Sequence, residues 1–263
     1  MNIYLGFMIS LVSGLYTSLW GAFKDSPFED FKPHTFPRSI YFHAVIFAAL
    51  FAIPLFHDAF VELKFFQLFF LVMGLERFLA ELYKGFFRTE DQTKYFVPSR
   101  ITFFGKYVGS DFLRYLVGTV LVLAVFAVAT LPFPITSFWA FLAVGYGTGL
   151  LVSLGGAYKD APFEGFHPLK FQRSGAVLAV CVPLFYFIND PLQPISLGFL
   201  VYMNGGLERF VVEYYKTYVQ RTMSGKFKQD LVRLQHRVES REKFHYAAWG
   251  IIAGLVALYT MEL

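Results

Sequence analysis

Long apolar runs recur along the 263-residue chain and set its pattern of hydrophobic and polar positions. Each run holds roughly 17 to 22 mostly apolar residues, which is the length that an α-helix needs to cross about 30 Å of hydrocarbon. The pattern therefore predicts an all-α, polytopic membrane protein with about eight transmembrane helices. The predicted spans cover residues 3–22, 40–57, 65–84, 113–131, 137–157, 175–189, 194–216 and 246–261.

Two blocks of sequence occur twice. Residues 21–31 read GAFKDSPFEDF and residues 156–166 read GAYKDAPFEGF, with eight identities in eleven positions, and GLERFLAELYK at 74–84 recurs as GLERFVVEYYK at 206–216. Such self-similarity divides the chain into two homologous halves of four predicted spans each, residues 1–134 and 135–263. Because four is even, both halves begin on the same side of the membrane, and we expect parallel repeats about an axis along the membrane normal.

The basic residues are distributed unevenly between the two faces that this topology defines. Of 23 Lys and Arg residues, 20 lie in or beside the loops that follow the first and third spans of each half, at 24–38, 84–114, 159–173 and 216–243. Cytoplasmic loops carry such an excess of Lys and Arg. We therefore expect the motif-bearing loops in the cytoplasm and both termini outside.

Composition excludes an ordinary soluble domain. Only 16% of the residues are charged and 56% are hydrophobic, whereas about a quarter of the residues in a soluble domain are charged. A nucleic-acid partner is not expected for so apolar a chain. Its one cysteine, Cys181, lies inside an apolar run, and its six histidines lack metal-ligand spacing, so we expect no disulfide, metal or cofactor.

Ionisable residues inside two predicted spans are the leading candidates for a functional site, because charges within a membrane are costly. Positions i, i+4 and i+7 share a helix face, so Arg77, Glu81 and Lys84 form one stripe that alternates in sign. A buried salt bridge that fixes helix packing, with the lysine extending to the interface, is the alternative interpretation. The candidate set is Glu76, Arg77, Glu81 and Lys84 in the first half and Glu208, Arg209, Glu213 and Lys216 in the second.

The repeated FKDxPFExF motif follows the first span of each half. Pro27 and Pro162 are expected to break the helix there. The motif then forms either an interfacial turn that holds the halves together or a cradle for a lipid headgroup, with Arg38 and Arg173 reaching the phosphate. The candidate binding residues in the motif are Lys24, Asp25, Lys159 and Asp160.

Residues 216–243 form the longest polar stretch. Leu231, Leu234 and Val238 recur there at helical spacing among basic residues that include Arg241. This pattern predicts a basic amphipathic helix lying on an anionic membrane surface.

The duplicated RFxxExxK motif resembles the RFxxExxR motif of the prolipoprotein diacylglyceryl transferase family, in which a polar loop and one last helix follow it. Each half resembles the C-terminal four-helix unit of that family. The family's Gly-Arg-x-x-Asn-Phe-x-Asn segment has no match near Gly14 or Gly149. The resemblance thus implies a shared lipid-handling architecture. The positions of this chain that match the RFxxExxR motif are Arg77, Phe78, Glu81, Lys84, Arg209, Phe210, Glu213 and Lys216.

These features predict a membrane enzyme that transfers part of a phospholipid, or of another phosphate-bearing lipid, to an acceptor. Arg77 and Arg209 would neutralise the phosphate, while the glutamates would orient them or act as bases. The remaining basic candidates would hold the headgroup, and Asn204 adds polarity that favours a site in the second half. A transporter or channel is the alternative, although no span is obviously broken. A non-catalytic scaffold is a third possibility.

Overall fold

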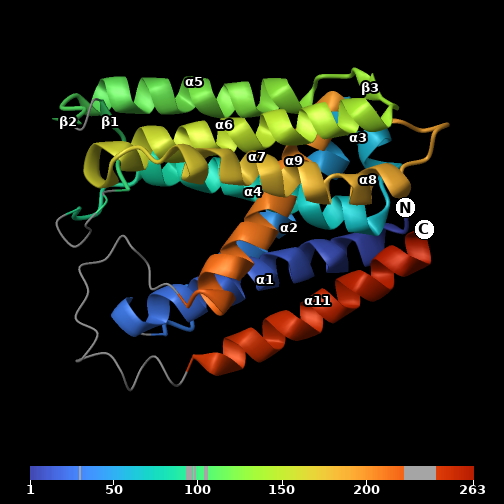
Figure 1. Ribbon diagram of the computed structural model, residues 1–263, viewed down its shortest axis with the longest axis horizontal. Helices are drawn as coiled ribbons and strands as arrows, with labels where there is room; N and C mark the ends of the chain where they lie inside the picture. The colour runs from blue at the N-terminus through green and yellow to red at the C-terminus, as the bar shows by residue number, and fades with distance from the viewer. Residues whose placement is uncertain (30, 93–96, 98, 104–105, 222–240) are drawn as a thin grey trace.

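The computed structural model describes residues 1–29, 31–92, 97, 99–103, 106–221 and 241–263. It is an all-α bundle in which most of the long helices run along the long axis of the molecule (Figure 1). The first half contains α1 (Ile3–Glu29), α2 (Arg38–Ala52), α3 (Pro54–Val61), α4 (Phe65–Leu82), the π-helical turn η1 (Tyr83–Phe87), the short strands β1 (Thr102–Phe103) and β2 (Lys106–Tyr107), and α5 (Asp111–Ala129).

The second half has a similar succession of helices, with its short strands at other places. It contains the short strand β3 (Pro134–Ile135), α6 (Phe138–Glu164), α7 (Pro168–Cys181), α8 (Pro183–Phe187), the strand β4 (Ile195–Ser196), α9 (Leu197–Tyr214), the π-helical turn η2 (Tyr215–Val219) and α11 (Glu242–Glu262). The predicted amphipathic helix lies almost wholly outside the described residues.

Within the described residues, four helices are long and apolar enough to cross a membrane, namely Ile3–Ser26, Asp111–Ala129, Phe138–Phe163 and Glu242–Glu262. A fifth span results if α2 and α3 are taken together, although they are bent by 101°. These helices indicate a membrane protein, and the eight expected spans are not shown. At a rise of about 1.5 Å per residue, α2 and α7 are too short to cross alone. The helices α4 and α9 each carry three charged residues.

The second helix of each half is interrupted by proline. Pro54 begins α3 directly after α2, and Pro183 begins α8 directly after α7. Proline lacks the N–H that would continue the helical hydrogen bonds and clashes with the preceding turn. Both predicted second spans are therefore interrupted, at places six residues apart in the register of the repeat.

The expected breaks at Pro27 and Pro162 are also wrong. The helix α1 continues to Glu29 and α6 continues to Glu164. A proline near the last turn interferes with only one hydrogen bond of the helix, and few residues follow it. In the second half the end of the helix is set instead by Gly165, which has a φ of 81° that glycine adopts readily.

The centre of the bundle is the crossing of α4 and α9. Buried side chains of these two helices, such as Phe70, Met73, Met203 and Leu207, belong to one hydrophobic core. On either side, α1 packs against α2 and α6 packs against α7. This arrangement brings the two copies of the GLERF block side by side.

Both chain termini lie at the end of the bundle opposite the motif-bearing loops (Figure 1). The amino group of Met1 donates to the carbonyl of Val61 at 2.8 Å. The Glu262 carboxylate accepts from the backbone N–H groups of Phe65 and Phe66 at 2.7 and 3.0 Å. Glu262 at the end of α11 therefore caps the first turn of α4, where helix N–H groups lack partners.

Candidate functional site

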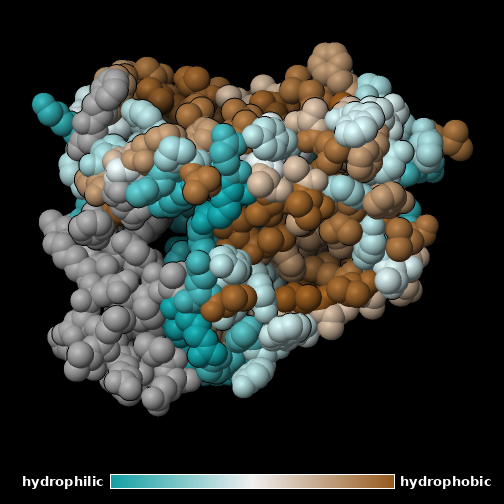
Figure 2. Space-filling view, in the orientation of Figure 1, coloured by the Kyte–Doolittle hydropathy of each residue, from teal (hydrophilic) through white to brown (hydrophobic). Residues whose placement is uncertain are grey.

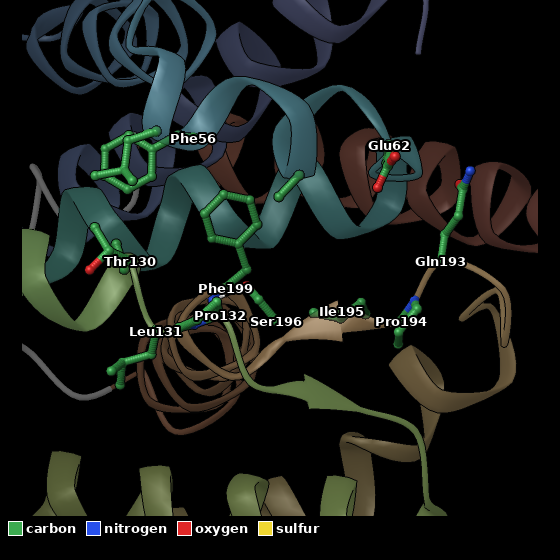
Figure 3. Close-up of a pocket in the computed structure, with 13 residues that line it drawn as sticks. Phe56, Glu62, Thr130, Leu131, Pro132, Gln193, Pro194, Ile195, Ser196 and Phe199 are labelled. Carbon is green, nitrogen blue, oxygen red and sulfur yellow. Dashed lines mark hydrogen bonds between the residues drawn. The ribbon is translucent and has the colours of Figure 1, made fainter.

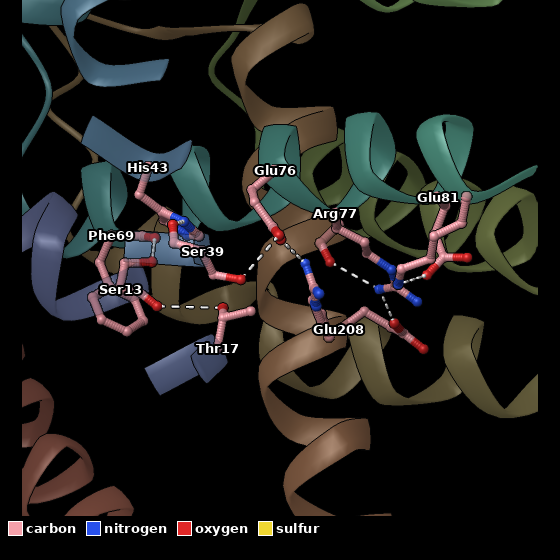
Figure 4. A network of polar contacts seen from close by, with 12 residues as sticks. Ser13, Thr17, Ser39, His43, Phe69, Glu76, Arg77, Glu81 and Glu208 are labelled. Carbon is pink, nitrogen blue, oxygen red and sulfur yellow. Dashed lines mark hydrogen bonds and ion pairs between the residues drawn. The ribbon is translucent and has the colours of Figure 1, made fainter. Parts of the chain in front are cut away.

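The four GLERF charges pair across the two halves. Arg77 on α4 pairs with Glu208 on α9, and Arg209 on α9 pairs with Glu76 on α4. Both glutamates and Arg209 are buried. Arg77 also donates to the carbonyl of Gly205 at 3.0 Å. Each arginine is therefore held by the half to which it does not belong, and Figure 4 shows Arg77 beside Glu208.

A serine supports each of these glutamates. Ser174 in the middle of α7 donates to Glu208 at 2.5 Å, and Ser39 at the start of α2 lies 3.5 Å from Glu76. The two serines occupy equivalent positions in the repeat, 135 residues apart. A buried carboxylate needs such additional hydrogen bonds besides its cation. The inner pairs are thus a satisfied polar layer between the halves.

A second layer of ion pairs lies one helical turn closer to the motif loops. Lys24 on α1 is 3.4 Å from Glu213 on α9, and Lys159 on α6 is 3.8 Å from Glu81 on α4. These pairs also cross between the halves. Each glutamate has a further lysine three residues later on its own helix, Lys84 at 3.0 Å and Lys216 at 3.6 Å.

The lysines of this outer layer that follow α4 and α9 lie in π-helical turns. Lys84 belongs to η1 and Lys216 to η2. In both turns a backbone N–H bonds the carbonyl five residues earlier, from Arg88 to Tyr83 and from Gln220 to Tyr215. Such turns are rare and occur frequently at functional sites. Their presence in both halves sets the position of each lysine relative to its glutamate.

The described ion pairs of this cluster join six cationic side chains to four carboxylates. Two positive charges therefore remain in excess. Adding the predicted residues Arg38, Arg173, Asp25 and Asp160 leaves that difference unchanged. An excess of positive charge attracts an anion, and guanidinium groups suit phosphate oxygens. On the face drawn in Figure 2, hydrophilic side chains gather toward the motif end of the bundle.

Other predicted site residues lie around or beside this cluster. Arg38 is exposed, and Asp25 and Asp160 are partly exposed. Arg173 is partly buried, and its Nε atom has no hydrogen-bond partner among the described residues. Asn204 is fully buried, and in the described part of the chain neither atom of its amide is bonded. Within the described ranges, no hydrogen bond joins Asn204 to the ion pairs.

The two sides of the cluster differ in accessibility. We call Arg77, Glu81, Lys84 and Lys159 the Arg77 side, and Arg209, Glu213, Lys216 and Lys24 the Arg209 side. The side chains of Arg77 and Glu81 are 19% and 48% exposed, whereas those of Arg209 and Glu213 are 6% and 16% exposed. The arginine and the glutamate are therefore more open on the Arg77 side. The lysines do not follow this trend, since Lys84 and Lys159 are 25% and 19% exposed and Lys216 and Lys24 are 33% and 21% exposed.

Trp20 accounts for part of this difference. Its ring centroid is 5.1 Å from the guanidinium carbon of Arg209 and 5.7 Å from the ammonium of Lys24. The equivalent position in the second half is Gly155, around which a Cβ atom would meet nothing within 4 Å. The Arg209 side is thus covered by an indole where the Arg77 side has open space.

Sequence reasoning missed His43. Its ring is buried, its Nδ1 lies 2.7 Å from the carbonyl of Ser39, and its Nε2 has no partner within the described ranges. Figure 4 places it beside Ser39 and Glu76. The equivalent position in the second half is Leu178. Comparing the halves position by position would have singled out this histidine, whereas the search for metal-ligand spacing did not.

The fourth long helix of each half, α5 and α11, also carries a pair of ionisable residues that sequence reasoning missed. Arg114 lies 2.9 Å from Asp111 at the start of α5, and His245 lies 3.7 Å from Glu242 at the start of α11. These helices depart from the repeat in their packing. The helix α5 packs against η1, α4 and α9, whereas α11 packs against α1 and α4. The surroundings of the two sides are therefore unequal.

A surface cavity of about 220 Å³ lies at the terminal end of the bundle, between α3, the end of α5 and the start of α9. Figure 3 shows Phe56 and Phe199 on its walls and Glu62 and Gln193 toward one end. The predicted site residues are not among the described residues that line it. In the described parts of the chain, no group of three or more His, Cys, Asp or Glu residues has the arrangement of a metal site.

Comparisons of this chain with protein-family models, with curated proteins and with solved structures found no match. The likeness to the prolipoprotein diacylglyceryl transferase family therefore rests on the duplicated motif alone.

Proposed function

We propose that this protein is an integral membrane transferase that binds a phospholipid, or another lipid bearing a phosphate, and transfers part of it to an acceptor. The observation that carries this proposal is the excess of two positive charges in the crossed ion pairs, together with the exposure of Glu81. The exposed fraction of Glu81 favours the Arg77 side, in place of the second-half site that Asn204 suggested.

The proposal includes two parallel four-helix repeats in which the short second helices and the charged α4 and α9 are held inside the membrane by the outer helices. The termini would then face the outside and the motif-bearing loops the cytoplasm, in line with the distribution of Lys and Arg. A lipid in the cytoplasmic leaflet would present its phosphate at the depth of the outer ion-pair layer.

Each residue of the Arg77 side has a role in this proposal. Arg77 holds the phosphate, because its planar guanidinium offers paired donors to phosphate oxygens. Lys84 and Lys159 surround Glu81 and add charge toward the interface. Glu81 accepts the proton of the acceptor nucleophile as that nucleophile bonds to the transferred group. The bond from that group to the phosphate oxygen breaks, and Arg77 stabilises the charge left on the phosphate.

The test uses vesicles that contain phospholipid labelled in the acyl chains or, separately, in the phosphate headgroup. Purified protein is reconstituted into them and supplied with a membrane extract as the source of acceptor. Transfer of the acyl label to the extract is the expected result, because the phosphate is the leaving group of the proposed step. The paired variant R77Q/E208Q, which leaves no lone buried charge, should reduce transfer to background, and E62Q at the far end of the bundle should retain it. Lipid that stays unchanged with the unmodified protein would contradict the proposal.

A transporter is the second candidate, and the breaks at Pro54 and Pro183 favour it. Proline-interrupted segments at corresponding positions of two repeats mark the binding sites of many transporters. However, Ser39 lies beside Glu76 in the first turn of α2, and the break comes after Ala52, about 20 Å away at 1.5 Å per residue. Flux of a solute into sealed vesicles without chemical change in any lipid would support the transporter.

A further inference from the structure

The halves place different residues over the same pair of charges. Trp20 and Gly155 are equivalent positions, four residues before Lys24 and Lys159 respectively. Residues four apart share a helix face. Trp20 and Gly155 therefore lie on the same helix faces as Lys24 and Lys159, which pair with Glu213 and Glu81. On the Arg209 side this position holds an indole within cation–π distance of Arg209 and Lys24.

The indole of Trp20 contacts the neighbouring cations through the face of its ring. Its Nε1 atom is buried and has no hydrogen-bond partner among the described residues. The two cations therefore provide the polar contacts of this side chain, and they do so through its π-system. The ring thus covers one face of the Arg209 guanidinium.

We propose that the Arg209 side is a second binding site for a phosphate ester, and that Trp20 keeps it closed. The inference rests on the proposed function, because it assumes that the equivalent Arg77 side binds a phosphate. Both sides have the same charges in the same order, an arginine, a glutamate and two lysines. The glycine at position 155 leaves one set open, and the tryptophan at position 20 covers the other.

The other residues around the closed side agree with this assignment. Tyr16, one turn before Trp20, donates to the carbonyl of Phe210 at 3.3 Å and stacks on its ring. The equivalent of Tyr16 is Leu151, which is exposed. The Arg209 side is thus covered by side chains from one face of α1. Removing the Trp20 indole exposes Arg209 without changing the number of charges.

The experiment counts bound lipids by native mass spectrometry of the full-length, delipidated protein titrated with phosphatidic acid. The unmodified protein should bind one lipid per chain. The variant W20G should bind two, and G155W, which places an indole where a side chain meets open space, should bind none. The double variant W20G/G155W should bind one lipid, and this binding should now be lost on neutralising Arg209 with its partner as E76Q/R209Q.

The outcomes distinguish a failure of the proposed function from a failure of the closed second site. If the unmodified protein binds no phosphatidic acid, the proposed function fails. If it binds one lipid and W20G also binds one, the proposed function stands and the closed second site is wrong. Where W20G lowers the yield of folded protein, W20A serves the same purpose, because it also removes the ring.

A further arm distinguishes a lipid-bound phosphate from a soluble one. Glycerol 3-phosphate carries the same phosphate ester without acyl chains. Displacement of the second phosphatidic acid from W20G by glycerol 3-phosphate at similar concentration would assign the site to soluble phosphate esters. Retention of the lipid under the same conditions would assign it to a lipid headgroup.

Discussion

Gly74 lies against Gly206 where α4 crosses α9. A Cβ atom added to Gly74 would overlap the backbone of Tyr202 and approach the backbone nitrogen of Gly206, and one added to Gly206 would overlap the carbonyl of Phe70. The absence of side chains at these two positions lets the helix backbones touch. This contact brings Glu76 and Arg77 within reach of Arg209 and Glu208, so the crossed ion pairs depend on it.

Replacing either glycine by alanine should therefore destabilise the protein. Because a backbone cannot move aside as a side chain can, we expect G74A and G206A each to lower the free energy of unfolding by about 3 kcal/mol or more. Unfolding of the purified protein in detergent, followed by circular dichroism, measures the effect. G250A is the matched control, since a Cβ at Gly250 meets nothing within 4 Å. Equal stability of G74A and G250A would show that the close crossing is absent.

The inner ion pairs should be coupled across the halves. Removing one partner leaves a buried charge alone, so E76Q and R209Q should each lose about 3–5 kcal/mol of stability. The double variant E76Q/R209Q should recover much of that loss, because no unpaired charge remains. A double-mutant cycle on the unfolding free energies gives the coupling. Additive losses would mean that these two side chains do not interact.

The outer pair offers a comparison within the same protein. Glu81 and Lys159 are 3.8 Å apart and Glu81 is 48% exposed. Exposed ion pairs contribute about 0–1 kcal/mol. We expect E81Q to change stability by less than about 1 kcal/mol while it abolishes transfer in the vesicle assay. Loss of folded protein comparable to that in E76Q would assign Glu81 to packing instead of chemistry.

Replacing Glu262 should lower the stability of the protein. Its carboxylate accepts two backbone hydrogen bonds at the first turn of α4, and Lys64 donates to its carbonyl. E262Q removes the charge from a helix N-terminus, so a loss of about 1 kcal/mol in unfolding free energy is expected. E62Q at the same end serves as control. A melting temperature unchanged in E262Q and E62Q alike would contradict the capping role.

The sequence predicted the components of the site more completely than their pairing. The repeat and the charges of the GLERF blocks identify Glu76, Arg77, Glu208 and Arg209 without coordinates. Which cation meets which carboxylate depends on how two helices cross, and that is decided by contacts between residues 132 positions apart. The spacing i, i+4 pointed to a pairing of Arg77 with Glu81 along one helix, whereas the structure pairs Arg77 with Glu208.

The ends of the helices were predicted less well, because the effect of a proline depends on where in the helix it lies. Pro27 and Pro162 lie in a last turn, where a lost hydrogen bond is tolerated, so they do not end α1 and α6. Pro54 and Pro183 interrupt apolar runs that hydropathy treats as continuous. Hydropathy averages over a window and therefore does not register these breaks, although the prolines are visible in the sequence.

The orientation of the protein can be tested with introduced cysteines. In a C181S background, Q193C lies at the terminal end of the bundle and H34C at the motif end, and both positions are exposed. A membrane-impermeant maleimide should label Q193C in intact cells and H34C only after lysis. Labelling of H34C in intact cells would place the motif-bearing loops outside and contradict the proposed orientation.

The central claim, that the crossed charges bind the phosphate of a lipid, is tested most directly by the lipid phosphorus retained after purification in detergent. The unmodified protein should retain phosphorus, and R77Q/E208Q, with the same number of charges removed from each sign, should lose it while remaining folded. Equal phosphorus in the two proteins would contradict the claim and leave the ion pairs as a device that holds the halves together.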